Sequence, residues 1–319
     1  MKILFTSVGR RVELMQAFRE AAKELKVDLK IFGADITESA PALFFCDETR
    51  IVCKIKEPEY IPQLLKICES EKIDCLIPTI DTDLLLLAEN KKRFEEIGTK
   101  VLISAADKVK ICRDKRYTAD YFMSVGLKSP VPVDRVENYT HGYPAFIKPK
   151  DGSSSIDAYK VNCEEDLKMY AQKIQDYIIQ PFISGKEFTI DIFCDYEGNP
   201  VYITPRERMA VRAGEVLKTR ICQDEQMIRE MLTLVKDYKP CGQITVQLIR
   251  EELTGEDYYI EINPRFGGGA PLSMKAGADS AKAVIRMLNG EKLSYIAKAA
   301  KDQSVYSRFD QSICVFEGV

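Results

Sequence analysis

The chain has no tryptophan and only one histidine, His141, among its 319 residues. Its ten cysteines include no C-x-x-C pair, so the ligand spacing of a zinc site is missing. No apolar run reaches membrane-spanning length, and the N-terminus begins with a strand-like segment, residues 2–6, instead of a targeting signal. These absences predict a cytoplasmic protein with no membrane partner.

A strong excess of charge of one sign is also missing. The net charge is −3, and lysine and arginine are spread along the chain, which predicts no nucleic-acid partner. Several cysteines lie in apolar, strand-like runs and are interpreted as small core residues with reduced thiols. These are Cys53, Cys75, Cys194, Cys241 and Cys314.

Two common nucleotide-binding motifs are absent as well. The segment 7–11 has a single glycine, Gly9, and therefore lacks the G-x-G-x-x-G fingerprint of a dinucleotide site. The polar loop 151–155 lacks the G-K-[ST] ending of a P-loop. A nicotinamide-linked oxidoreductase is thus a disfavoured hypothesis.

Residues 1–104 alternate apolar strands with amphipathic helices, which predicts a parallel sheet covered on both faces. Ligands bind beyond the carboxyl ends of such strands, where Arg10, Arg11 and Asp81 are found. Arg11 is interpreted as a solvated charge at a helix start, whereas solvation and anion binding both stay open for Arg10. Asp81 and Asp83 are candidate helix caps.

Ser104 is predicted to cap the next helix and to mark a boundary, with residues 108–125 forming one continuous helix. Lys148 then lies on a predicted strand that leads into the loop 151–155. This loop has the composition of a phosphate cradle or, alternatively, of a flexible hairpin turn. Residues 184–187 are expected to be a linker, in which Glu187 could accept from ribose hydroxyls.

Two predicted strands, 242–249 and 257–263, alternate apolar and polar side chains. Glu261 and Asn263 lie on one face of the second strand, and Gln247 lies on the matching face of the first. Oxygen ligands arranged in this way predict a magnesium platform. A strand that simply ends in a polar loop is the alternative.

The segment 205–218 is expected to be a loop, and it is either a solvated edge or an anion clamp. Its charged candidates are Arg206, Arg208, Arg212 and Lys218. Residues 276–288 are predicted to form a helix behind a glycine-rich turn. Residues 290–319 are expected to add a helix and a strand.

Together, several segments resemble the ATP-grasp superfamily in their order and spacing, and in particular its carbamoyl-phosphate-synthase-like branch of carboxylate–amine ligases. They are residues 8–13, 77–83, 114–115, 146–149, 180–188, 247 and 261–265. The resemblance implies an α/β and α+β fold, with an N-terminal Rossmann-like parallel sheet followed by a two-subdomain ATP-grasp fold. The implied domains are 1–104, 105–183 (linker helices and small lid subdomain) and 184–319 (C-terminal subdomain with the metal site).

The resemblance also implies a role for each matched residue. The phosphates would be contacted by Lys115, Lys148 and the closing loop of Gly152, Ser153, Ser154 and Ser155. The adenosine would be contacted by Gln180, Phe182, Ile183 and Glu187. One or two Mg²⁺ (or Mn²⁺) ions would be bound by Gln247, Glu261 and Asn263. The catalytic residues at the phosphoryl and acyl groups would be Arg265, Arg206 and Lys218. Separately from the resemblance, the residues expected to contact the substrate are Gly9, Arg10, Asp81, Arg208, Arg212 and Gly268.

Two positions depart from the family pattern. Gln180 replaces a glutamate that is common at the adenine, and Gln247 replaces an acidic residue, as in the synthase branch. The expected activity is ATP- and Mg²⁺-dependent activation of a carboxylate as an acyl phosphate, which an amine or similar nucleophile attacks. A regulatory ATP-binding protein is the alternative. Small-molecule substrates are the expected partners, and a homodimer is the default assembly.

Overall fold

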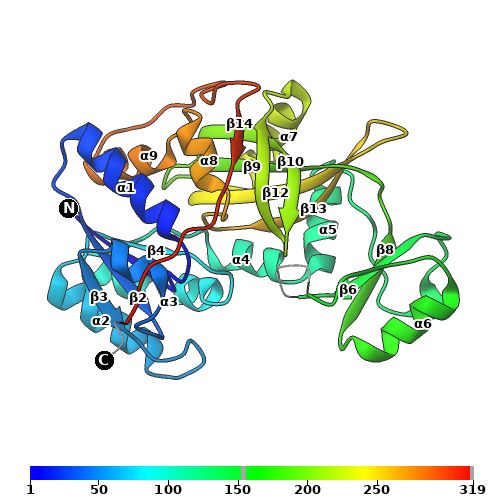
Figure 1. Cartoon of the computed structure of the whole chain (residues 1–319), viewed down its shortest axis with the longest axis horizontal. Helices are drawn as coiled ribbons and strands as arrows, with labels where there is room; N and C mark the ends of the chain where they lie inside the picture. The colour runs from blue at the N-terminus through cyan, green and yellow to red at the C-terminus, as the bar shows by residue number, and fades with distance from the viewer. Residues whose placement is uncertain (152–155, 317–319) are drawn as a thin grey trace.

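The computed structural model describes residues 1–151 and 156–316, which form three sheets (Figure 1). The N-terminal sheet is parallel, in the order β3-β2-β1-β4-β5. Its strands are β1 (Lys2–Thr6), β2 (Lys30–Asp35), β3 (Glu48–Ile51), β4 (Cys75–Pro78) and β5 (Lys100–Val101). The predicted Rossmann-like unit is confirmed.

Helices cover both faces of the N-terminal sheet because its strands are apolar on both sides. Alternate residues of β1 enter different cores: Ile3 and Phe5 pack with α1, whereas Leu4 packs with α2 and α3. These helices are α1 (Val12–Leu25), α2 (Tyr60–Glu71) and α3 (Leu84–Glu96), and a short 3₁₀ helix, η1, spans Pro41–Phe45.

The largest sheet is antiparallel, with the order β13-β12-β9-β10-β11-β14. Its strands are β9 (Gly185–Cys194), β10 (Pro200–Arg212), β11 (Glu215–Ile221), β12 (Gly242–Glu251), β13 (Asp257–Asn263) and β14 (Val305–Ser307). Ile190, Val246 and their neighbours on one face pack against α5 (Lys115–Ser124) and α7 (Glu225–Tyr238). Because side chains alternate along a strand, Thr189 and Thr245 lie on the opposite face.

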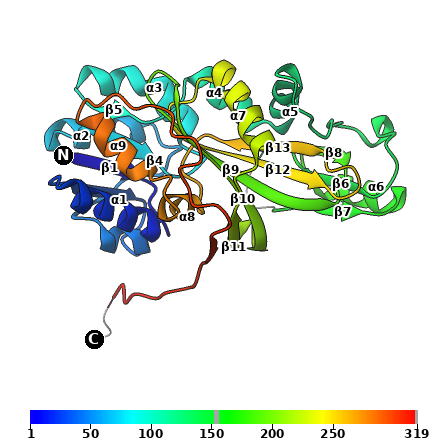
Figure 2. The ribbon, with the colours of Figure 1, turned by 90° about the horizontal axis from the view of Figure 1, so that it is seen from above.

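A small antiparallel sheet, in the order β7-β6-β8, projects at one end of the molecule (Figure 2). It consists of β6 (Ala145–Pro149), β7 (Tyr159–Val161) and β8 (Tyr177–Pro181), with α6 (Glu164–Lys173) packed on it and η2 (Val136–Asn138) nearby. The two antiparallel sheets are the two subdomains that the resemblance implied.

Two predicted helices have different bounds in the structure. The segment 108–125 divides into α4 (Ala106–Arg113) and α5, because Asp114 is extended and its side chain accepts a hydrogen bond from the Arg116 amide. The predicted helix 276–288 begins only at Ser280, as α9 (Ser280–Leu288); a separate helix, α8 (Ala270–Lys275), precedes it, and Gly277, with a φ of 121°, lies between the two. Ser104 is not a cap; its hydroxyl accepts from the Cys241 amide.

Three segments expected to be irregular or helical are different in the structure. The predicted linker 184–187 is the beginning of β9, and the predicted loop 205–218 is a β-hairpin formed by β10 and β11. After residue 290, the described part of the chain contains β14 and no helix. All ten cysteines are free, and Cys314 is exposed instead of lying in an apolar strand.

Phe18 of α1 joins the N-terminal sheet to the turn that follows β13. Its buried ring packs edge-on against Phe5 at 5.0 Å and Phe266 at 5.9 Å between ring centroids. We expect Phe18→Ala to lower the free energy of unfolding by about 3–5 kcal/mol, because the ring leaves a cavity that its neighbours cannot fill. Urea unfolding measures this loss. Phe44→Ala, at a ring that is 44% exposed, is the control, and an equal loss there would contradict the prediction.

Candidate nucleotide and metal site

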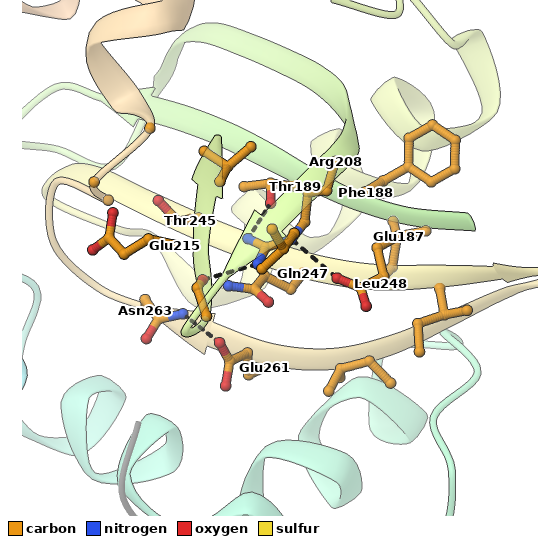
Figure 3. A pocket seen from close by; sticks show the side chains of 18 of the residues that line it. Glu187, Phe188, Thr189, Arg208, Glu215, Thr245, Gln247, Leu248, Glu261 and Asn263 are labelled. Carbon is orange, nitrogen blue, oxygen red and sulfur yellow. Dashed lines mark hydrogen bonds and ion pairs between the residues drawn. The ribbon is translucent and has the colours of Figure 1, made fainter. Parts of the chain in front are cut away.

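An open cavity of about 290 Å³ lies between the large sheet, the small sheet and the turn after β13. Its volume is near the lower end of the range for small-molecule sites, roughly 300–1,000 Å³. Figure 3 shows the side chains that β9, β10, β12 and β13 contribute. The predicted site residues that line it are Lys115, Lys148, Glu187, Arg206, Arg208, Gln247, Glu261, Asn263, Arg265 and Gly268.

Gln247, Glu261 and Asn263 all line this cavity, as the sequence predicted. Gln247 is opposite Glu261 in the β12–β13 ladder, and the Asn263 amide donates to the Glu261 carboxylate at 2.9 Å (Figure 3). Within the described residues, no three His, Cys, Asp or Glu side chains gather as a metal cluster. One carboxylate with two amide oxygens fits Mg²⁺, which takes its remaining ligands from phosphates and water.

Two lysines form the opposite wall. Lys115 is the first residue of α5, and Lys148 lies on β6 with only 7% of its surface exposed. Burial lowers the pKa of Lys148 to about 8, with a further contribution from the charge of Lys115. Burial also lowers the pKa of Lys115. Desolvated cations that repel one another are stabilised by a polyanion, so this wall suits a polyphosphate.

Arg206 is held by a buried network that the sequence analysis missed. Its Nε donates to Asp191 at 2.8 Å, and Asp191 also accepts from Ser273 at 2.6 Å and from Thr245 at 3.3 Å. Both partners of the ion pair are almost completely buried. Asp191 lies within an apolar-looking strand, and only its alternation with Ile190 and Ile192 could have indicated this role.

The backbone of the turn after β13 lies directly on this network. A Cβ atom at Gly269 would lie 2.7 Å from a guanidinium nitrogen of Arg206 and 2.8 Å from Val216. A Cβ atom at Gly268 would lie 2.3 Å from a carboxylate oxygen of Glu215. A side chain at Gly269 would therefore displace Arg206 from its buried ion pair, and one at Gly268 would push aside the ends of the Glu215 and Arg11 side chains.

Arg208 and Arg265 are also paired with carboxylates. Arg208 donates to Glu187 at 3.1 Å and to the Gly214 carbonyl at 2.9 Å. Arg265 donates to Asp81 at 2.7 Å and approaches the side-chain oxygen of Asn263 at 3.5 Å. Asp81 follows β4 of the parallel sheet, so this ion pair connects the N-terminal unit to the strand that carries Glu261.

Arg10, Arg212 and Lys218 do not line the cavity. Arg10 has 85% of its side chain exposed, and Arg212 pairs with Asp310 on the surface. Lys218 is opposite Ala210, beside an irregularity in the hairpin register, and stays exposed. These three placements correct the predicted roles: Arg10 lies in the exposed loop before α1, and Arg212 and Lys218 lie in the exposed part of the β10–β11 hairpin, where the register is irregular.

Three further predictions about the N-terminal unit need correction. Arg11 lines the cavity with 19% of its side chain exposed, so its interpretation as a solvated helix-start charge is wrong. Gly9 lies outside the cavity lining, and its amide donates to Asp35 at 2.8 Å. Asp83 occupies the N-cap position of α3, but its side chain does not cap the helix; it accepts from Thr6 at 2.8 Å.

The predicted adenine residues are also outside the cavity lining. Gln180 is buried on β8, and its amide donates to the Pro130 carbonyl at 2.6 Å. The ring of Phe182 lies 6.3 Å from that of Phe146, which does line the cavity. Ile183 is not part of the lining. The predicted phosphate loop of Gly152, Ser153, Ser154 and Ser155 lies outside the described residues.

A parallel sheet beside two antiparallel sheets, with lysines facing an acid–amide strand pair, defines the ATP-grasp class of proteins. The ATP-grasp domain model matches residues 112–269, and the model of the PylC-like N-terminal domain matches residues 3–102. The chain therefore belongs to the ATP-grasp superfamily, in its carbamoyl-phosphate-synthase-like branch.

Two curated relatives and one solved structure show the range of similarity. The 3-methyl-D-ornithine–L-lysine ligase of Methanosarcina acetivorans is 28% identical over 57% of this chain and 46% of that protein. The N-terminal section of the carbamoyl phosphate synthase large chain of Methanopyrus kandleri is 23% identical over 96% and 59%. The biotin carboxylase domain of Hydrogenobacter thermophilus 2-oxoglutarate carboxylase, a complex with MgADP and bicarbonate, matches with a TM-score of 0.74 and 18% identity over 95% and 73%.

This chain spans about half the length of these two curated relatives. The structural match shows a shared fold. Within residues 1–151 and 156–316, every helix is too short or too polar to span a membrane.

The Asp191–Arg206 pair predicts a stability effect. Asp191→Asn removes the negative charge and leaves a buried guanidinium uncompensated, which should lower the free energy of unfolding by about 3–5 kcal/mol. Chemical denaturation measures this change. The matched control is Asp310→Asn, whose ion pairs are exposed and should contribute little. Equal stability of Asp191→Asn and the unmodified protein would refute a structural role for this pair.

Proposed function

We propose that the chain catalyses ATP-dependent ligation: a carboxylate is activated as an acyl phosphate, and an amine or similar nucleophile then attacks it. The observation that supports this most directly is the cavity itself, in which Lys115 and Lys148 face Glu261, Gln247 and Asn263. Membership of the ATP-grasp superfamily and the similarity to an amino-acid ligase agree with it.

Lys115 and Lys148 would bind the phosphates of ATP. Glu187 would accept hydrogen bonds from the ribose hydroxyls after its ion pair with Arg208 breaks. Gln247, Glu261 and Asn263 would hold one or two Mg²⁺ ions. Bound Mg²⁺ neutralises charge on the phosphates. All other contributions come from positioning by the chain's own side chains.

In the first step, a carboxylate oxygen of the substrate attacks the γ-phosphorus of ATP. A new P–O bond forms, the bond to the β,γ-bridging oxygen breaks, and ADP leaves. Arg265 and Arg206 would compensate the charge on the transferred group. In the second step, the neutral amine attacks the acyl carbon, the C–O bond to phosphate breaks, and the amine releases a proton to solvent.

Cysteine chemistry is not needed in this scheme, since no covalent enzyme intermediate forms. A regulatory ATP-binding protein is the second candidate, and it would bind the nucleotide without releasing ADP. For the assembly and location, a homodimer in the cytoplasm is our proposal; the ten free thiols agree with a reducing compartment.

Glu261→Gln tests the metal assignment. The substitution keeps the shape of the side chain but removes the one carboxylate of the platform, so ADP formation should fall by roughly a hundredfold or more. A coupled assay for ADP measures the rate, and Mn²⁺ binding followed by electron paramagnetic resonance should weaken in parallel. Glu252→Gln, at an exposed glutamate, is the control. Undiminished ADP formation in Glu261→Gln would remove this residue from the mechanism.

Lys148 predicts how nucleotide affinity depends on pH. In the free protein its pKa is about 8, and bound phosphates should raise that pKa by favouring the charged form. Nucleotide binding therefore takes up a proton near pH 8. The affinity for the nucleotide is highest below this pH and falls as the pH rises above it. Titration calorimetry with MgADP between about pH 7 and 9.5 measures this profile.

Lys148→Arg provides the control for the profile. A guanidinium stays protonated throughout this range, so the fall in affinity above pH 8 should disappear. If the unmodified protein and Lys148→Arg showed the same pH profile, another group would be responsible.

A further inference from the structure

The cavity has two ends with different surrounding charges. The lysine end is formed by Lys115 and Lys148, both of which interact with Glu261. The other end is formed by Arg11, whose charged neighbours are Arg265, Glu215, Asp81 and Arg308. Under the proposed function, the nucleotide phosphates occupy the lysine end. The arginine end is then left for the small-molecule substrate.

Arg11 differs from the other arginines that line the cavity. The nearest carboxylate oxygen is 2.8 Å from Arg206, 3.1 Å from Arg208 and 2.7 Å from Arg265. The corresponding distance for Arg11, to Glu215, is 3.9 Å. Within the described residues, the guanidinium of Arg11 donates one hydrogen bond, a long one of 3.3 Å to the Thr79 carbonyl. Arg11 is therefore the most weakly paired of these cations.

Glu215 is already engaged elsewhere. Arg308 donates to its carboxylate at 2.9 Å, which leaves Arg11 with a shared and distant partner. Burial, together with the nearby charge of Arg265, lowers the pKa of Arg11 to about 10. A buried cation with incomplete pairing is unfavourable, so the site gains stability when an anion approaches.

The guanidinium of Arg11 packs against the turn at Gly268, where an added Cβ atom would lie 2.9 Å from one of its nitrogens. Gly268 and Arg11 both line the cavity. The planar guanidinium matches the two oxygens of a carboxylate.

We infer that Arg11 binds a carboxylate group of the small-molecule substrate, at the end of the cavity lined by Gly268 and Glu215. Arg11 is thus a specificity residue supplied by the N-terminal sheet. This inference rests on the proposed function, because the lysine end must hold the nucleotide.

The experiment compares nucleotide and carboxylate binding to Arg11→Ala by thermal shift and titration calorimetry. The probes are MgADP, inorganic phosphate, and a panel of acetate, succinate, citrate, L-aspartate, L-glutamate and L-lysine, each carboxylate added with MgADP present. At least one carboxylate should bind the unmodified protein saturably. In Arg11→Ala its affinity should fall roughly tenfold or more, since a charged hydrogen bond is lost, while MgADP affinity is retained.

Two variants separate binding from a structural role. Arg11→Gln can still donate to the Thr79 carbonyl but lacks the charge, so it should lose carboxylate affinity as Arg11→Ala does. Arg11→Lys keeps the positive charge, so it should recover part of the carboxylate affinity. Arg10→Ala, at the exposed neighbouring arginine, is the control and should behave as the unmodified protein.

The outcomes distinguish the two proposals. If MgADP fails to bind the unmodified protein, the proposed function fails. The inference about Arg11 alone is overturned if MgADP binds but no carboxylate does. It is also overturned if Arg11→Gln binds the carboxylate with the same affinity as the unmodified protein. Loss of phosphate affinity without loss of carboxylate affinity would also overturn it, because Arg11 would then belong to the phosphate site.

Discussion

The burial of positive charge around one cavity is the constraint on which the structure depends. Lys148 and Arg11 are desolvated strongly enough to lower the pKa of both side chains. Burying a cation is costly unless an anion compensates it. Fixed carboxylates such as Asp191 and Asp81 compensate Arg206 and Arg265. Under the proposed function, phosphates would compensate Lys148, and a substrate carboxylate would compensate Arg11.

The cavity exists only when the three sheets are assembled. The large sheet supplies the metal platform, the small sheet supplies Lys148, and the N-terminal sheet supplies Arg11. The Asp81–Arg265 ion pair and the packing of Phe18 on Phe266 hold the N-terminal sheet against the turn that completes the cavity. Since both contacts join the same two units, movement of one unit relative to the other would change the surroundings of both Arg11 and Glu261.

Much of this arrangement could be predicted from local patterns. The period-two alternation of β12 and β13 placed Gln247, Glu261 and Asn263 on one face, and the structure has them on that face. Helix boundaries were less predictable, because the helical pattern of 108–125 continues across Asp114. The arginine-rich segment after residue 205 is a strand where a loop was expected, since the polar end of β10 lacks the apolar alternation that identifies a strand.

The sequence by itself determined the fold class and the common face of Gln247, Glu261 and Asn263, because strand periodicity decides those features; the family resemblance indicated Lys115 and Lys148. Only the tertiary structure decided which of two adjacent arginines, Arg10 or Arg11, enters the cavity, and that Asp191 holds Arg206. The physical reason is that the burial of a side chain depends on which distant segment packs over it. For Arg11 that segment is the turn at Gly268, more than two hundred residues further along the chain.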